Sequence, residues 1–441
     1  MTTSMQLEGL ARFIEAAPCN FFAIAEQART LTKAGYEQLG EGDEWAVKPG
    51  GKYFTCRNGS ALVAWRVPEV TPASLMVMAS HSDSPTLRIK TAPEVKTADA
   101  YTTLNVELYG GALLSTWFDR PLSMAGRIMV QDGDAARPQL VNIKRDLLLI
   151  PSLAIHMNRE ANKGFELNVQ KDLLPLYGNA DATDLMDVVA AEAGVERSQI
   201  ISHELVLYNR QAPVQWGANA EYFSAPRLDD LMCAYSSLAG FLASESVQTD
   251  ALCMHVVFDN EEVGSSTKQG AASTLLKDTF ERICNALRLD VEQQKQLVAN
   301  GFMLSADNGH ALHPNYPEKC DPTNQPTLGA GLLVKHAANQ RYTTDAASEA
   351  VVSLLAQHAG VRLQHFFNRS DTPGGSTLGN ISTAQLPLLT ADIGAAQLAM
   401  HSAYETCSAN DADALVALAT ELFSSTLSTD IKGGIALKAQ R

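Results

Sequence analysis

The stretch Ala251-Leu-Cys-Met-His-Val-Val-Phe258-Asp-Asn-Glu-Glu-Val-Gly264 is an apolar run that ends in three carboxylates within four residues. The apolar part is typical of a buried strand. Crowded carboxylates repel one another and raise one another's pKa, so a strand end that carries several of them usually faces a cation. Of Glu261 and Glu262, one can bind a metal while the other takes a proton from a water molecule. A solvated acidic turn is the alternative that these residues alone leave open.

Composition and charge favour a globular enzyme. The chain has 441 residues, of which 46% are hydrophobic and 19% charged, and this length predicts two domains. The 34 basic residues against 49 acidic ones give a net charge of −15, which repels nucleic acid and anionic membrane surfaces. We therefore expect neither nucleic acid nor a membrane as a partner.

The cysteines and the N-terminus indicate a cytoplasmic protein. The seven cysteines are scattered and form no Cys-x-x-Cys pair, which predicts reduced thiols. The start, Met1-Thr-Thr-Ser4, lacks a basic segment followed by an apolar one, and no apolar run is long enough to span a bilayer. Neither secretion nor membrane insertion is expected.

Residue patterns predict α/β structure at both ends of the chain. Apolar residues at helical spacing predict a helix over Ser4–Ile14, and Asn58-Gly59 predicts a hairpin turn between two strands within Lys52–Val67. Short apolar runs predict buried strands. The predicted strands are Leu75–Ala79, Ala251–Phe258, Gly301–Ala306 and Pro387–Ala391. One further amphipathic helix is predicted over Asn410–Phe423.

The middle of the chain has a different pattern. Between about residues 92 and 220, short strand-like segments such as Asn105–Tyr109 and Gly126–Val130 are separated by Gly110-Gly111, Asp132-Gly133 and several prolines. This pattern predicts an inserted β-rich domain over 92–220, within an α/β domain made of 1–91 and 221–441.

Several candidate ligands directly follow apolar runs, where open α/β sheets place their ligands. They are His81 with Asp83, Glu261 with Glu262, and Asp307, to which Asp229 and His401 are added. Two histidines and three carboxylates suit a pair of Zn²⁺ ions about 3.5–4 Å apart with Asp229 as the bridge. Taken singly, His81 could be a satisfied strand-end histidine, Asp229 a helix N-cap, and His401 part of a helix face.

The candidate residues lie in five blocks of sequence, which are His81-Ser-Asp83-Ser-Pro, Arg227-Leu-Asp229-Asp230, Asp259-Asn-Glu261-Glu262-Val-Gly264, Asp307-Asn-Gly-His310-Ala-Leu-His313-Pro-Asn and Ala399-Met-His401-Ser. These blocks, in this order, resemble the aspartyl aminopeptidase family of dinuclear zinc aminopeptidases, and the resemblance to a bacterial member covers nearly the whole chain. It implies a catalytic α/β/α sandwich with a mixed sheet and an inserted β-rich dimerisation domain.

The resemblance also implies a role for each site residue. His81 and Asp307 would hold one zinc, and Glu262 and His401 the other, with Asp229 between them. Two further residues would take part in catalysis without binding zinc. Asp83 would accept the second ring N–H of His81, and Glu261 would be the general base that deprotonates a bridging water and then protonates the leaving amine.

Substrate selection is expected from residues outside the metal ligands. Lys335 matches a family lysine that faces the carboxylate of an acidic first residue, and His156 matches a histidine that reaches into the active site of a neighbouring subunit. For His156, a bond to zinc is the alternative to a contact with the substrate or oxyanion. His310 and His313 lie just past Asp307 and are expected to contact the substrate or to support the metal ligands. Gly374 and Gly375 would allow the substrate backbone to approach closely.

The implied enzyme is an aspartyl aminopeptidase-like metalloexopeptidase that removes Asp or Glu from peptides with a free N-terminus. It would hold two Zn²⁺ per subunit, with Co²⁺ or Mn²⁺ as substitutes, in a homo-oligomer, a dodecamer built from dimers. A dinuclear zinc deacylase or carboxypeptidase, and a scaffold without turnover, are the alternatives. The remaining histidines show no metal spacing, so core or surface roles are expected for His203, His255, His336, His358 and His365.

Overall fold

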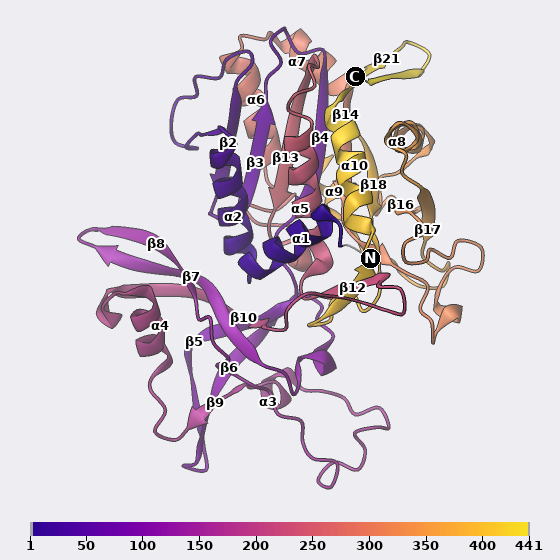
Figure 1. Ribbon diagram of the computed structural model, residues 1–441. Coiled ribbons are helices and arrows are strands. Elements are labelled where there is room, and N and C mark those ends of the chain that lie inside the picture. Colours follow the sequence, from indigo (N-terminus) through magenta and orange to yellow (C-terminus); the bar gives the residue numbers. More distant parts are fainter. Residues whose placement is uncertain (1–2, 440–441) are drawn as a thin grey trace.

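The computed structural model describes residues 3–439 and is organised around a nine-stranded mixed sheet (Figure 1). The strand order is β1-β2-β3-β13-β4-β14-β18-β16-β17. The central strands β13, β4, β14 and β18 are mutually parallel, whereas β3 and β16 run antiparallel to them. The strands are β1 Glu37–Gln38, β2 Lys52–Arg57, β3 Ala61–Arg66, β4 Ser74–His81, β13 Ala251–Phe258, β14 Gly301–Ala306, β16 Leu332–His336, β17 Leu363–Phe367 and β18 Leu389–Gly394.

Helices cover both faces of this sheet because its central strands are apolar on both sides. In β4, Met76 and Met78 join the core on one face, while Leu75 and Val77 join the core on the other. The first face carries α1 Met5–Ala16, α2 Asn20–Lys33, α5 Leu228–Ala243, α8 Ala346–Ala359 and α10 Asp411–Phe423, and the second carries α6 Leu275–Ala286, α7 Val291–Ala299 and α9 Leu378–Ser382. The expected α/β/α sandwich with a mixed sheet is confirmed.

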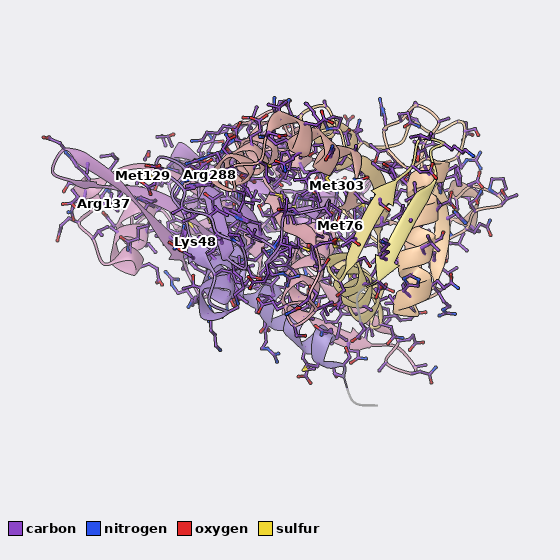
Figure 2. The ribbon with its side chains drawn as sticks, turned by 90° about the horizontal axis from the view of Figure 1, so that it is seen from above. Lys48, Met76, Met129, Arg137, Arg288 and Met303 are labelled. Atoms are coloured by element: carbon purple, nitrogen blue, oxygen red, sulfur yellow. The ribbon has the colours of Figure 1, made fainter. Side chains whose placement is uncertain are left out.

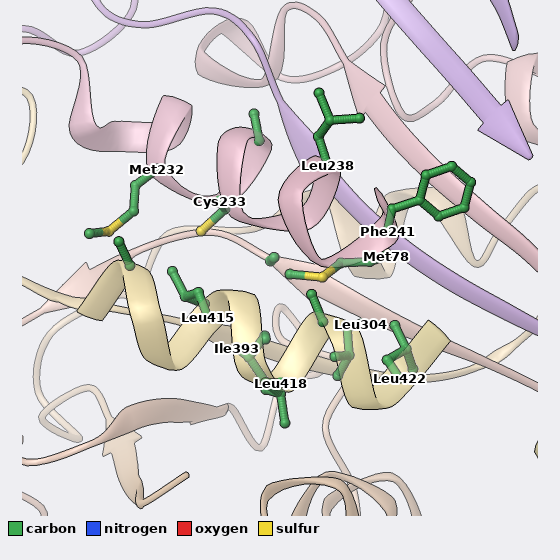
Figure 3. Packing of buried hydrophobic residues seen from close by; sticks show 14 of the residues in the cluster. Met78, Met232, Cys233, Leu238, Phe241, Leu304, Ile393, Leu415, Leu418 and Leu422 are labelled. Carbon is green, nitrogen blue, oxygen red and sulfur yellow. The ribbon is translucent and has the colours of Figure 1, made fainter. Parts of the chain in front are cut away.

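On the first face, α5 lies against α10 (Figure 3). Met232 and Cys233 of α5 point towards α10, which presents Leu415, and all three are buried in one core. At the closest approach, Gly240 of α5 leaves no room for a side chain beside the backbone of α10. This packing fixes the start of α5, which carries Asp229.

A second sheet of six antiparallel strands has its own core and lies below the first in Figure 1. Figure 2 shows Met129 and Arg137 of its hairpin β7–β8 at one end of the molecule, away from Met76 and Met303 of the large sheet. Its strands, in the order β8-β7-β10-β5-β6-β9, are β5 Thr86–Thr97, β6 Tyr101–Tyr109, β7 Leu122–Asp132, β8 Ala135–Asn142, β9 Leu176–Asn179 and β10 Ile200–Asn209. Strand β5 crosses the predicted boundary between residues 91 and 92. The boundaries of the inserted domain and its role in dimerisation stay predictions.

Short elements complete the described residues. Strand β12 pairs with β20 in a three-stranded sheet, and this pair lies next to the start of α5. The remaining elements are α3 Val169–Asp172, α4 Leu185–Ala193, β11 Val214–Trp216, β12 Tyr222–Ala225, β15 Gly309–His310, β19 Ala396–Gln397, β20 Glu405–Ser408, β21 Ser425–Thr429 and β22 Ile435–Ala439.

Most predicted elements are confirmed. Ser4 caps α1 by accepting the backbone N–H of Leu7, and Asn58 and Gly59 both have positive φ in the β2–β3 turn. The strand expected over Pro387–Ala391 begins later, at Leu389, because the Leu388 N–H donates to the Leu386 carbonyl instead of to a neighbouring strand.

Two further findings bear on the expected cellular setting. All seven cysteines are free, in agreement with reduced thiols. Within residues 3–439, no helix has both the length and the apolar character that crossing a membrane requires. The cytoplasmic location stays a prediction.

Candidate metal centre

Three neighbouring parallel strands bring the predicted ligands to one edge of the large sheet. Strands β13 and β14 flank β4, and Phe258 at the end of β13 is paired with His81 at the end of β4. Glu261 and Glu262 form a short 3₁₀ turn just beyond β13, and Asp307 directly follows β14. The expectation that these residues meet at the carboxyl ends of the strands agrees with this arrangement.

Asp229 lies between the two predicted histidine ligands. Its Oδ1 is 3.4 Å from Nε2 of His81, and its Oδ2 is 3.5 Å from Nε2 of His401. Two ligand atoms of one tetrahedral zinc ion, each about 2.0–2.1 Å from the metal, are about 3.3 Å apart. Each oxygen of Asp229 is therefore at the separation expected for sharing an ion with a different imidazole.

The other two carboxylates lie around this group. Oε2 of Glu262 is 3.3 Å from Nε2 of His401, and Glu262 also has a ligand atom within 4.8 Å of those of His81 and Asp229. Asp307 and Asp230 each offer an oxygen within 4.8 Å of Asp229. The structure thus brings together all five predicted ligands and adds Asp230, whose Oδ2 also accepts the backbone N–H of His81 at 3.2 Å.

Hydrogen bonds fix the tautomer of both imidazoles. Nδ1 of His81 donates to the carbonyl oxygen of Asp83 at 3.1 Å, with the Asp83 carboxylate slightly further away at 3.4 Å. Nδ1 of His401 donates to the carbonyl oxygen of Gly111 at 3.0 Å. Because a neutral imidazole carries one N–H, both Nε2 atoms keep a lone pair that is available to a metal.

The Asp83 carboxylate also holds the segment that contains the two glutamates. Its oxygens accept the backbone N–H groups of Glu261 at 3.1 Å and Glu262 at 3.2 Å. The hydroxyl of Tyr109, at the end of β6, donates to the same carboxylate at 2.6 Å. Tyr109 was not among the predicted site residues, since nothing in its local sequence marks it.

Glu405 plays a matching part on the other side of the centre. Its two oxygens accept the backbone N–H groups of Asp229 at 3.1 Å and His401 at 2.7 Å. It reaches both because β20 pairs with β12, where Glu405 lies opposite Ala225. Asp229 is not the N-cap of α5, since Arg227 holds that position and Asp229 has non-helical backbone angles.

The centre concentrates negative charge in a buried place. Burial, together with the charges of Asp307 and Asp83, raises the pKa of Glu261 to about 8, and burial with the charge of Asp229 raises the pKa of Glu262 well above its usual value. Burial also opposes ionisation of Asp229, but the neighbouring imidazoles of His401 and His81 outweigh it and lower its pKa.

The donor atoms of the centre fit zinc. Oδ1 of Asp229 and Oε1 of Glu262 are buried and have no hydrogen-bond partner among the described residues. A buried carboxylate oxygen without a partner is costly unless a cation faces it. Imidazole nitrogens and carboxylate oxygens at these separations are a donor set that zinc prefers.

Lys335 is buried beside the centre. Its ammonium donates to the carbonyl oxygen of Asn308 at 2.6 Å and lies 3.4 Å from Oδ2 of Asp307. Burial lowers its pKa, but the charge of Asp307 more than offsets this effect, so the pKa is raised and the side chain stays charged. Lys335 lies in β16, one residue before the end of the strand.

A cleft of about 480 Å³ contains other predicted residues, namely His310, Gly374 and Gly375, together with His313. His310 lies three residues beyond Asp307, and the lining residue Ala399 lies two residues before His401. Within the described part of this single chain, His156 is exposed on the segment between β8 and α3 and makes no contact with the centre that the other residues form.

The fold and the donor set define a protein with a buried metal centre, and comparison with known proteins gives its family. Residues 13–423 match the family described as Aminopeptidase I zinc metalloprotease (M18). A curated relative from Clostridium novyi (strain NT), "Probable M18 family aminopeptidase 2", is 43% identical over 412 residues, which are 91% of this chain and 94% of the relative. The chain belongs to the M18 family of zinc aminopeptidases.

Solved structures agree with this assignment. The cryo-EM structure of the Ape4 and Nbr1 complex contains a chain that matches with a TM-score of 0.91 and 32% identity, covering 96% of this chain and 87% of that one. The structure of the S. cerevisiae mApe1 dodecamer matches with a TM-score of 0.82 and 28% identity, covering 94% of this chain and 95% of that one.

Proposed function

We propose that this zinc aminopeptidase removes an N-terminal Asp or Glu from peptides and uses two Zn²⁺ per subunit. The position of Asp229 carries the proposal of two ions, because its two oxygens face two imidazoles that approach from different sides. His81 and Asp307 would hold one ion, and Glu262 and His401 the other, with Asp229 shared between them. Co²⁺ or Mn²⁺ would be accepted by the same nitrogen and oxygen donors.

Zinc bound at these residues would lower the pKa of a water molecule towards 7 and polarise the scissile carbonyl group. Glu261 would accept the proton of the attacking water and pass it to the leaving amine. Burial and the neighbouring carboxylates raise the pKa of Glu261, and the charge of bound zinc would lower it again, so that the carboxylate could accept a proton. Asp83 would keep Glu261 in place through the hydrogen bond to its backbone N–H.

Lys335 would select the acidic first residue. An ammonium group has three N–H donors, of which one binds the Asn308 carbonyl and a second points to Asp307. The third would bind the side-chain carboxylate of the substrate. His310, Gly374 and Gly375 would contact the peptide further along, since they line the adjoining cleft.

Assembly into a homo-oligomer would complete the site with His156 from a neighbouring subunit. The segment around His156 exposes large apolar side chains, among them Leu153, Ile155 and Met157, and exposed apolar groups of this density usually meet a partner. The dodecamer formed by mApe1 is the assembly that we propose, with residues 92–220 forming dimer contacts.

A peptide panel tests the proposal. Peptides that begin with Asp, Glu, Leu, Ala or Lys, each free or N-acetylated, are incubated with the zinc-loaded protein, and released amino acids are measured. Release of Asp and Glu from free peptides alone is the expected result. Equal release of neutral residues would contradict the proposal that Lys335 selects an acidic first residue. Cleavage of acetylated peptides would favour a deacylase or carboxypeptidase.

A further inference from the structure

A second group of metal-binding side chains lies at the outer edge of the large sheet. His336 ends β16, His365 lies in the edge strand β17, and Glu349 lies in the first turn of α8, which packs beside these strands (Figure 1). His336 follows Lys335, but successive strand residues point to opposite faces. His336 therefore points to the α8 face, on which Val334 is buried, while Lys335 points to the other face.

The three side chains converge on one point. Nδ1 of His365 is 3.4 Å from Nε2 of His336 and 3.4 Å from Oε1 of Glu349, and Nε2 of His336 is 3.9 Å from Oε2 of Glu349. These separations are long for hydrogen bonds between charged groups. They are close to the spacing of about 3.3 Å between two ligands of one tetrahedral zinc ion.

The side chains are also held in place. The ring of His336 stacks on Phe367 with 4.7 Å between centroids and an angle of 8° between the planes. Glu349 belongs to a helix that begins with a capping box formed by Asp345 and Ser348.

We propose that His336, Glu349 and His365 bind one divalent transition-metal ion, Zn²⁺ being the best match, at a site separate from the aminopeptidase centre. Two imidazole nitrogens and one carboxylate suit zinc better than calcium or magnesium, which prefer oxygen ligands. A water molecule would take the fourth position. The ion would link the edge strand β17 to α8 and so stabilise this side of the sheet.

Zinc content tests the site directly. The full chain and its Glu349→Gln and His365→Ala variants are equilibrated with micromolar Zn²⁺, desalted, and analysed for metal by mass spectrometry. We expect each variant to hold one zinc per chain less than the natural protein while peptide hydrolysis is unchanged. Glu421→Gln is the matched control, because Glu421 pairs with a single histidine, His358, at the surface. Equal zinc content in the natural protein and both variants would overturn the proposal.

Thermal unfolding tests the link between β17 and α8. The measurement is made in a His401→Ala background, in which zinc binding at the aminopeptidase centre is weakened. Added Zn²⁺ should raise the melting temperature of this chain by several degrees, and the additional His365→Ala substitution should abolish the increase. An equal increase with and without His365 would show that the ion does not act at this site.

Discussion

The backbone N–H of His401 donates a hydrogen bond of 2.7 Å to Oε1 of Glu405, and this contact fixes the loop that presents the His401 imidazole. Oε2 of the same carboxylate accepts the N–H of Asp229. One buried side chain therefore sets the relative position of Asp229 and of His401, one of its two histidine neighbours. Asp83 does the same for Glu261 and Glu262 on the opposite side.

Glu405→Gln should weaken zinc binding without unfolding the chain. The amide nitrogen of glutamine would face one of the two N–H groups, so one acceptor would be replaced by a donor. Loss of such a supporting contact typically lowers metal affinity by about 10–100-fold, and competition with a chelator would measure the change. Glu245→Gln, at a surface pair with Lys52, is the control. Unchanged affinity in Glu405→Gln would contradict the positioning role.

Glu261 and Glu262 should separate catalysis from metal binding. Glu261→Gln removes the proposed base, so we expect kcat to fall by about 10²–10⁴-fold while zinc content stays the same. Glu262→Gln, one residue away, should lose zinc instead, since its Oε2 lies 3.3 Å from Nε2 of His401. Metal analysis and kinetics on both variants make the comparison. Equal zinc loss in both would remove Glu261 from its assigned role.

The sequence marks the proposed ligands because strand ends are local features. An apolar run followed by polar residues marks His81, Glu262 and Asp307, and parallel pairing of β13, β4 and β14 then brings them together. The Asn58-Gly59 hairpin was predicted for the same reason, since its turn depends only on those two residues.

The supporting residues could not be predicted, because their roles depend on pairing between distant segments. Glu405 reaches Asp229 through the β12–β20 pair, and Gly111 reaches His401 only because the second sheet lies against the first. For the same reason, nothing in the sequence indicated that His336 and His365 lie close together. They lie far apart in the chain and become neighbours through the parallel pairing of β16 and β17.

Tyr109→Phe should reduce turnover with little effect on zinc content. Burial raises the pKa of Tyr109 far above its usual value, so the hydroxyl keeps the proton that it donates to Asp83. A hydrogen bond to a charged group contributes about 1.5–3 kcal/mol. Because this bond helps to hold Asp83, and through it Glu261, in position, we expect its loss to lower kcat by about 10-fold. Tyr177→Phe, whose hydroxyl binds the Thr183 carbonyl at the surface, is the control. A change in KM alone would count against positioning of Glu261.

Lys335→Met should discriminate between substrates. The proposed contact with an acidic first residue is a charge-assisted hydrogen bond, so kcat/KM for Asp-peptides should fall by about 10–100-fold more than for Ala-peptides. Zinc content is measured in parallel, because Lys335 also lies 3.4 Å from Asp307. Lys319→Met is the control, since Lys319 lines the neighbouring cleft. A uniform loss across all peptides, with zinc retained, would exclude the selective contact.

Folding stability should fall between pH 7.5 and pH 5 because of His255 in β13. This histidine is fully buried, and burial lowers its pKa to about 3. Its Nε2 donates to Oε1 of Gln27 at 2.8 Å and its Nδ1 accepts from the Ser237 hydroxyl at 2.7 Å, so the neutral ring is satisfied. Below its ordinary pKa of about 6.5, the unfolded chain takes up a proton that the folded chain refuses.

The stability that neutral His255 provides is complete above pH 6.5 and decreases as the pH falls towards 3. From pH 7.5 to pH 5 the decrease should be about 2 kcal/mol in the free energy of unfolding. Urea denaturation at both pH values measures it, and His255→Gln keeps a donor near Gln27 but cannot titrate. Because other groups titrate equally in both proteins, the difference between the two pH profiles isolates His255, and parallel profiles would show that His255 does not contribute.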